Sequence, residues 1–419
     1  MSRFVLSLLC LFSTAAPGQE TPLTISRAVD LAVSRNERAA VAETTVEAAE
    51  ARVRAARSFF MPQVDVIGSY RDDSALDTRR TLGASALLTQ PLFNARAFPL
   101  YRQVRLERDA TRLTATETRR LLGFDAADAF LVTLSFEQVL LAAENRREFA
   151  RTSLGDVRAR FEAGLVSSND VTRAELELAT AERAVAQGRG AVETARIQLG
   201  NLLNEEIDGP LQDPTGLLAA AAEMPEVDPS TVMVAQERRN DIAASRARLE
   251  GFRAFASEPN ARFIPSLSLS AQSRNINDGP ISEREQDAFF GVTMNWSIFD
   301  AGLRAAQRAE RNAIVRGLEL ELQQGMRDVE RQLRGAGVQL ASEQAARVQA
   351  VAAVTAARKN ALETNELYRQ GLGTALELAD ANQQLFEAQV AEVTARYRMA
   401  QAYLALREAS GVGPLGDSN

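Results

Sequence analysis

The side chains of this sequence that could do chemistry are carboxylates. Its 419 residues include no histidine, and the one cysteine, Cys10, lies in the N-terminal segment. The mature chain therefore cannot build a Cys–His or Ser–His–Asp site, or a zinc site with histidine or cysteine ligands. Chemistry by carboxylates alone stays open, but we expect no catalytic residue, no resident metal and no cofactor.

Two carboxylates stand at the start of a predicted helix. Glu377 and Asp380 are three residues apart, and residues at that spacing share one face of a helix. Two acids on one exposed face can attract cations. The first turn of a helix also favours acids because of the helix dipole. On the residues alone, an ordinary solvated helix face is the simpler interpretation.

The segment that leads into this helix occurs twice. YRQGLGTALEL at 368–378 repeats FEAGLVSSNDV at 161–171 with an offset of 207 positions. Gly164 and Gly371 occupy the same place in the two copies, and glycine permits a chain reversal that a residue with a Cβ would resist. Each copy therefore predicts a helix, a turn and a second helix. The predicted N-caps of the second helices are Ser168 or Asn169, and Thr374.

Further landmarks repeat in the same order, which indicates an internal duplication. FFMPQVDVIGSY at 59–70 matches RFIPSLSLSAQS at 262–273, and LLTQPLFNAR at 87–96 matches TMNWSIFDAG at 293–302. Prolines cluster between the copies, so we expect a connector there. The expected organisation is a first repeat at 19–208, a connector at 209–230, a second repeat at 231–411 and a tail at 412–419.

Each repeat is expected to run helix, strand, strand, very long helix, break, helix. Apolar residues spaced by threes and fours mark the helices, and no proline interrupts the longest one. At about 1.5 Å per residue this helix would be roughly 100 Å long, so it must lie against other long helices as coiled coil. The expected strands are about 62–72, 81–92, 265–275 and 287–299; the long helices are 95–158 and 301–368, and the shorter ones 169–203 and 375–409.

The four strands alternate between apolar and small polar residues. In SLSLSAQS, Leu267, Leu269 and Ala271 face one way and the serines face the other. AFFGVTMNWSIF continues this alternation through Trp296 and Ile298. Strands of about ten residues suit a tilted transmembrane β-strand, and uncharged polar faces suit a water-filled lumen. A soluble sheet with one face packed on a helix is the alternative.

The number of strands has a consequence for assembly. Four strands cannot close a barrel, and an open strand edge cannot sit in lipid. If these strands span a membrane, several copies of the chain must share one barrel. Two copies would supply eight strands and three copies twelve.

The N-terminal segment 1–18 is predicted to be a secretory signal peptide. Arg3 precedes an apolar run from Phe4 to Phe12, and small residues follow. We find no later apolar run of the roughly 18 residues that a transmembrane helix needs. The net charge of −7 is mixed in sign along the chain without a basic stripe, so nucleic acid is not an expected partner.

The chain resembles the TolC family of outer-membrane efflux proteins. The resemblance rests on the two turn motifs and the two strand hairpins, and it extends from TISRAVDLAVSRN at 24–36 to LALREASG at 404–411. It implies a mainly α-helical fold with a membrane β-barrel portion. Three chains would form a homotrimer with a twelve-stranded barrel in the outer membrane of a Gram-negative cell and an α-helical tunnel in the periplasm.

The resemblance also implies a function and partners. The chain would be the passive duct of a tripartite efflux or type I secretion system, gated at its periplasmic tip and without enzymatic activity. It would contact outer-membrane lipid, a periplasmic adaptor (membrane fusion) protein and an inner-membrane pump of the RND or ABC type. The absence of a GxxxxGK[ST] motif agrees with an energy source outside this chain.

Residue roles follow from the same resemblance. Glu377 and Asp380 would form a ring of acids that gates the entrance, and a hydrogen bond from Tyr368 to Asp170 would act as a clasp between the turns. A second link in the family needs an arginine where this sequence has Gly373. Trp296 and Tyr70 would lie in the aromatic girdle at the membrane interface, with a packed core as the alternative.

Two other classes of protein stay open as alternatives. A periplasmic adaptor should contain one coiled-coil hairpin and a soluble β-domain, whereas this chain predicts two of each element. A periplasmic coiled-coil scaffold without a pore predicts purification without detergent and no channel current. A drug, a metal ion and a polypeptide are all compatible with such a duct as the exported substrate.

Overall fold

The computed structural model describes residues 22–73, 79–223, 228–278 and 284–416, so the predicted signal peptide at 1–18 lies outside the described residues. The chain divides into two units. The tip unit contains the described residues up to Ala32 together with 126–220 and 348–397. The sheet unit contains Val33–Asp125, Ala221–Arg347 and the described residues from Arg398 onward.

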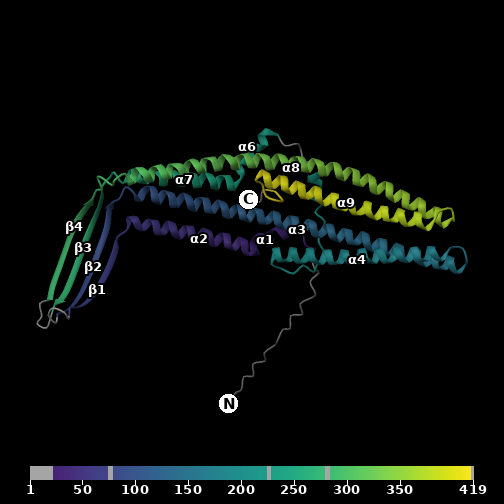
Figure 1. Cartoon of the computed structure of the whole chain (residues 1–419), viewed down its shortest axis with the longest axis horizontal. Coiled ribbons are helices and arrows are strands. Elements are labelled where there is room, and N and C mark those ends of the chain that lie inside the picture. The colour runs from purple at the N-terminus through teal and green to yellow at the C-terminus, as the bar shows by residue number, and fades with distance from the viewer. Residues whose placement is uncertain (1–21, 74–78, 224–227, 279–283, 417–419) are drawn as a thin grey trace, which may run out of the picture. The chain divides into compact units, whose positions relative to one another are not determined.

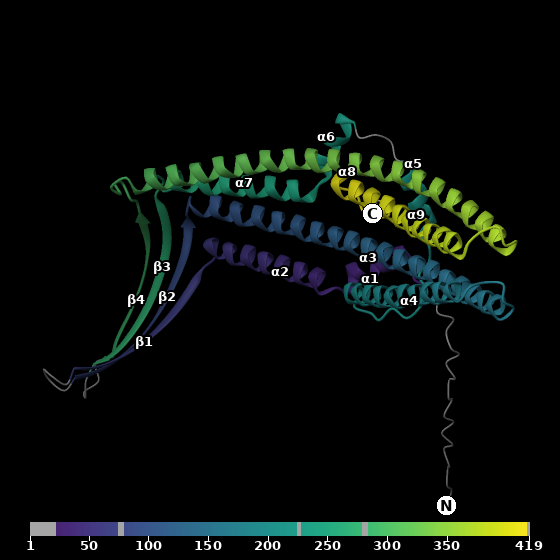
Figure 2. The ribbon, with the colours of Figure 1, turned by 45° about the vertical axis from the view of Figure 1, so that its right-hand side comes forward.

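The chain is mainly helical, as predicted (Figure 1). The α-helices are α1 (Ile25–Arg35), α2 (Glu37–Arg57), α3 (Ala97–Glu162), α4 (Ser168–Leu203), α5 (Thr215–Glu223), α6 (Pro229–Arg238), α7 (Asn240–Ala261), α8 (Leu303–Arg369) and α9 (Ala375–Ser410). The two longest, α3 and α8, have 66 and 67 residues. In the tip unit, α4 lies beside the C-terminal part of α3, and α9 beside the C-terminal part of α8 (Figure 2).

The helices that precede the strands differ from the prediction. The first repeat begins with two helices, because Asn36 ends α1 and caps α2 by accepting a hydrogen bond from the Arg38 N–H at 2.9 Å. The second repeat is also divided, between α6 and α7 at Arg239, but the Arg239 side chain does not cap α7. The connector predicted at 209–230 contains α5, a helix rich in alanine and leucine, which are strong helix formers.

Four antiparallel strands form one sheet in the order β1, β2, β3, β4 (Figure 1). The strands are β1 (Gln63–Asp73), β2 (Arg79–Phe93), β3 (Ser266–Asp278) and β4 (Arg284–Asn295). The register places Val64, Leu88, Ala271 and Phe290 in one row across the sheet, so most of the apolar residues of the four strands share a face. The exceptions on the other face include Ile67, Leu87 and Phe289. Small polar residues make a row on the opposite face: Gln63, Thr89, Ser270 and Gly291.

The apolar face of the sheet is not covered by the other described residues of the chain. Val66 is 76% exposed and Phe290 is 82% exposed. A soluble sheet packed on a helix would bury these side chains, so this alternative is wrong for the single chain. β1 and β4 also form the two edges of the sheet, each with one strand neighbour among the described residues.

β4 begins and ends earlier than the predicted 287–299, and this changes the place of one aromatic residue. The strand ends at Asn295, so Trp296 and Ile298 follow it and do not continue its alternation. The Trp296 indole N–H donates to the Phe263 carbonyl at 3.0 Å, which ties it to the segment before β3. Trp296 is 53% exposed and Tyr70 is 64% exposed, so neither packs into a core of this chain.

The expectation that no apolar run after the signal peptide is long enough for a transmembrane helix is wrong for one helix. α3 contains a stretch long and apolar enough to cross a membrane by length and composition. Such a stretch is weak evidence for a transmembrane helix, because a buried core helix has the same composition. Phe130 and Leu131 of α3 are fully buried within the chain, as expected of a core helix.

A buried carboxylate holds the sheet unit together where the helices meet the strands. Glu258 of α7 is 1% exposed and accepts hydrogen bonds from Arg96, just before α3, at 2.7 Å, from Arg262 at 2.8 Å and from Arg311 of α8 at 2.8 Å. Burial raises the pKa of Glu258, but the three guanidinium groups outweigh it and lower the pKa to about 2. Arg311 also stacks on the Phe255 ring, 3.7 Å from its centroid.

We predict that Glu258→Gln lowers the free energy of unfolding by roughly 3–5 kcal/mol at neutral pH, because the partly buried Arg262 and Arg311 and the more exposed Arg96 lose their buried counterion. The folded pKa lies below the ordinary value of 4.5. The stabilisation is therefore complete above pH 4.5 and is lost as the pH falls through about 2, where wild type and variant should converge. Denaturant unfolding of the purified protein across this range measures both effects.

Glu319→Gln is the matched control. Glu319 forms an ion pair of 2.6 Å with Arg253, but both side chains are more than a third exposed. Its loss should cost less than about 1 kcal/mol at any pH, because water screens the pair. Equal effects of the two substitutions would contradict a structural role for Glu258.

Candidate functional site

The two helical turns of the tip unit have the same backbone geometry. After α3 ends, Gly164 has a φ of 74°, and after α8 ends, Gly371 has a φ of 77°. The Leu165 N–H donates to the Arg160 carbonyl at 2.9 Å, and the Leu372 N–H donates to the carbonyl of Leu367 at 2.9 Å. Both turns thus use a glycine in the left-handed region to satisfy the last carbonyls of a long helix.

Each turn leads into a capping box. In the first turn, Ser167 is the N-cap of α4: its N–H and hydroxyl donate to the Asp170 carboxylate at 3.0 and 2.8 Å, and its hydroxyl accepts from the Asp170 N–H at 3.3 Å. The predicted N-cap at Ser168 or Asn169 is therefore wrong by one or two residues. In the second turn, Thr374 caps α9 through the same three bonds with Glu377, at 2.8, 3.0 and 3.2 Å.

The capping boxes give the two turn acids a local structural role. Hydrogen bonds from the Ser167 side chain and backbone lower the pKa of Asp170. Hydrogen bonds from the Thr374 backbone and side chain lower the pKa of Glu377. Because both pKa values are lowered, both carboxylates are ionised acceptors at neutral pH. The sequence already contained the signal for these caps, because serine or threonine three residues before an acid is the signature of a capping box.

The two candidate gate residues are both exposed at the start of α9. Their spacing places them on one face of the helix, as predicted. Glu377 is turned back toward Thr374, whereas Asp380 lies beyond the capping box. Of the two acids, only Glu377 takes part in the capping box of α9.

The predicted clasp between Tyr368 and Asp170 is not formed in this structure. Asp170 accepts from Ser167 instead, because a cap three residues away satisfies a helix N-terminus locally. Tyr368 is 7% exposed, and among the described residues its hydroxyl has no hydrogen-bond partner. Burial is the main cause that raises its pKa. Its ring packs with Val157 and Leu378 in a small core between the two turns.

A small cavity adjoins the Tyr368 ring. Its volume is about 30 Å³, and polar and apolar side chains from α3, α4, α8 and α9 line it. The polar lining residues include Ser153, Arg173, Glu177 and Asn382. The volume suits about one water molecule, so the cavity is too small for a substrate.

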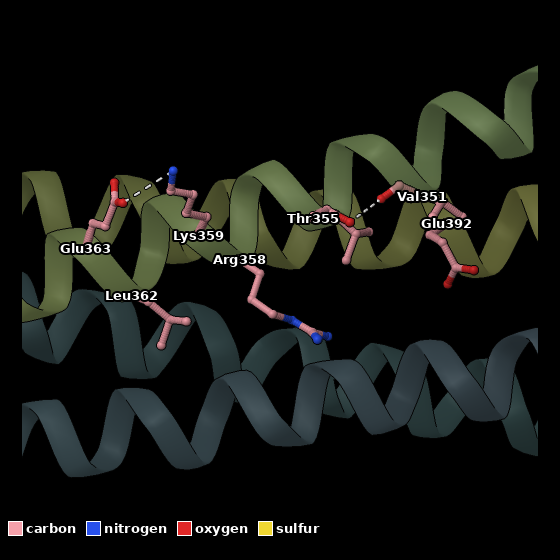
Figure 3. Close-up of a pocket in the computed structure, with 8 residues that line it drawn as sticks. Val351, Thr355, Arg358, Lys359, Leu362, Glu363 and Glu392 are labelled. Atoms are coloured by element: carbon pink, nitrogen blue, oxygen red, sulfur yellow. Dashed lines mark hydrogen bonds and ion pairs between the residues drawn. The ribbon is translucent and has the colours of Figure 1, made fainter.

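A larger groove runs along α8 and is open to solvent (Figure 3). Its volume is about 540 Å³, and it is lined by apolar residues and by charges of both signs. Lys359 pairs with Glu363 at 3.7 Å, and the Thr355 hydroxyl donates to the Val351 carbonyl at 2.9 Å. No group of three or more His, Cys, Asp and Glu side chains that could hold a metal ion occurs in the described part of the chain. The groove offers a surface and not an enclosed ligand site.

The geometry and the comparisons with known proteins define one class of protein. The chain matches the model of the outer membrane efflux protein family over residues 28–205 and 232–412. It belongs to this family, and the predicted resemblance is confirmed. It is an outer-membrane efflux channel protein.

Two curated relatives and one solved structure give the degree of similarity. The pyoverdine export outer membrane protein OpmQ of Pseudomonas putida is 25% identical over 74% of this chain and 66% of its own length. The cobalt-zinc-cadmium resistance protein CzcC of Cupriavidus metallidurans is 22% identical over 75% of this chain and 73% of its own. The crystal structure of CusC is 18% identical, with a TM-score of 0.81 over 93% of this chain and 92% of that one, and it shares the fold.

We predict that Tyr368→Phe leaves the free energy of unfolding unchanged or raises it by about 1 kcal/mol, because it removes a buried hydroxyl without a partner. Tyr368→Ala should instead lower it by roughly 3–5 kcal/mol, because the ring leaves a cavity in the small core. Chemical unfolding of both variants measures the difference. A destabilisation of more than about 1 kcal/mol in the phenylalanine variant would mean that the hydroxyl bonds to another group.

Proposed function

We propose that three copies of this chain form one passive export duct in the outer membrane. The observation that carries this proposal is the four-stranded sheet, whose apolar face is exposed and whose edges β1 and β4 have no second neighbour among the described residues. In lipid, unpaired edges are too costly to persist, and a closed barrel removes them. Three sheets of this size give twelve strands around a lumen.

The strands suit this placement in length and in polarity. They have 11 to 15 residues, enough to span the outer membrane at a tilt. The exposed row that contains Val64 and Phe290 would face lipid, and the row that contains Thr89 and Ser270 would face the lumen. Tyr70 lies toward the loop end of β1, and Trp296 lies just beyond the opposite end of β4. These two aromatics would mark the two membrane interfaces.

The entrance of the duct would lie at the two turns of the tip unit. Three chains would place three copies of Glu377 and of Asp380 near one axis, as an acidic ring that attracts cations. Asp380 would carry most of this effect, because the Glu377 carboxylate also caps α9.

The duct would work with a periplasmic adaptor and an inner-membrane pump of the RND or ABC type, and it would not catalyse a reaction. Energy would come from the pump. Relatives of similar identity are named for pyoverdine export and for cobalt, zinc and cadmium resistance. Such different cargoes suit a duct that does not bind what it passes. Selection of the cargo would therefore belong to the pump.

The first experiment measures assembly and conduction together. Native mass spectrometry of the detergent-solubilised protein should give the mass of three chains, and the same sample should conduct ions in planar bilayers. A monomer that stays soluble without detergent would contradict the duct. That outcome would favour a periplasmic scaffold.

A second experiment separates charge from capping at the entrance. The double substitution Glu377→Gln with Asp380→Asn keeps hydrogen-bonding side chains at both positions, so α9 keeps its cap. It should weaken block by divalent cations about tenfold and raise single-channel conductance, because the acidic ring loses its charge. Asp170→Asn is the matched control, since it changes the equivalent acid of the first turn. Unchanged block in the double variant would refute the ring.

A further inference from the structure

One arginine joins the two turns of the tip unit. Arg160, in the last turn of α3, donates from one guanidinium nitrogen to the Tyr368 carbonyl at 3.2 Å and from another to the Arg369 carbonyl at 3.2 Å. Its guanidinium also lies over the Tyr368 ring, 5.0 Å from the centroid. Both acceptors belong to the last turn of α8, so the contact spans the two helical hairpins.

The chemistry of this contact is that of a cation at a helix C-terminus. The last carbonyls of α8 lack partners within the helix, and they carry the negative end of the helix dipole. A planar guanidinium can donate to two of them at once, which an ammonium group cannot do with the same geometry. The face of the tyrosine ring attracts the same cation. Arg160, from a different hairpin, is thus a second donor to the Tyr368 carbonyl, which also accepts from the Gly371 N–H at 3.1 Å, and it adds a donor to the Arg369 carbonyl and a cation over the ring.

The contact is not repeated in the second copy. The residue 207 positions after Arg160 is Leu367, whose side chain cannot donate a hydrogen bond. Gly373 has no side chain, and a Cβ at that position would meet the Tyr368 nitrogen at 3.2 Å and a carbon of Leu367 at 3.4 Å. The second turn is therefore tightly folded on itself. Arg160 of the first turn reaches to it.

We infer that Arg160 is the positioning residue that holds the second turn against the first and so keeps the entrance closed at rest. The inference rests on the proposed duct for its effect on current, but the contact itself belongs to one chain. Tyr368 contributes its carbonyl and its ring to this contact, and its hydroxyl contributes nothing. When the hydrogen bonds from Arg160 to the end of α8 break, the hairpin of α8 and α9 is released from the hairpin of α3 and α4.

The test compares Arg160→Ala with a control two residues away. Arg158 lies on the same helix and pairs with Glu175 of α4 at 2.7 Å, within the first hairpin alone. Hydrogen exchange of the intact protein, followed by mass spectrometry, should show faster exchange at 366–373 in Arg160→Ala and wild-type exchange in Arg158→Ala. Loss of a charge-assisted link should raise the resting open probability in planar bilayers about tenfold in Arg160→Ala only. Arg160→Lys, which keeps the positive charge, should show smaller increases in hydrogen exchange and in open probability than Arg160→Ala.

The two readouts separate this inference from the proposed function. Faster exchange without a change in current would support the link between the turns and contradict their place at the entrance of a duct. Wild-type exchange in Arg160→Ala would overturn the inference, whatever the current. Equal effects of Arg158→Ala and Arg160→Ala would also overturn it, because they would reflect a general loss of charge at the end of α3.

Discussion

The structure depends on one constraint, which is that the backbone groups along the outer edges of β1 and β4 need partners. A sheet in water can leave such groups to the solvent, but a sheet in lipid cannot. This sheet also leaves its apolar face open, with Phe290 82% exposed, so water is an unfavourable environment for it as well. A single chain is consequently an incomplete folding unit at its strands. The charged junction around Glu258 bonds to Arg96, which follows β2, and to Arg262, which precedes β3, so it fixes the two β-hairpins to the same helices.

The regular parts of this fold could be predicted because their signals are local. Strand alternation has a period of two residues, and the register placed the predicted apolar residues in common rows. The long helices followed from an uninterrupted apolar spacing. The end of β4 could not be predicted from alternation, because Trp296 continues the apolar pattern although the strand ends at Asn295. The Trp296 indole N–H donates to the Phe263 carbonyl, which the pattern does not reveal. α5 was missed because the prolines around it concealed its alanine-rich core.

The charged contacts were beyond prediction for a different reason. Arg96 and Arg311 reach Glu258 from distant parts of a chain in which arginine is abundant, so their spacing carries no signal. Only Arg262, four residues after Glu258, has the spacing of an ion pair within one helix turn. At the turns the signal existed but pointed elsewhere. Family resemblance assigned Asp170 to a long-range clasp, whereas the spacing of Ser167 and Asp170 already predicts a capping box. A partner three residues away is available whenever the helix forms, and a tyrosine from another hairpin is not.

The duplication explains which features of the tip are shared and which are not. Each hairpin must reverse its chain and cap its second helix, so both copies keep the glycine and the cap acid: Gly164 with Asp170, and Gly371 with Glu377. A contact between the hairpins has no such need to occur twice, because one donor on one copy is enough to join them. Arg160 and its counterpart Leu367 differ in this way. In a duplicated chain, the residues that fold each copy are therefore expected in both. A residue that joins the two copies can be present in one copy alone, so a search for repeated motifs does not find it.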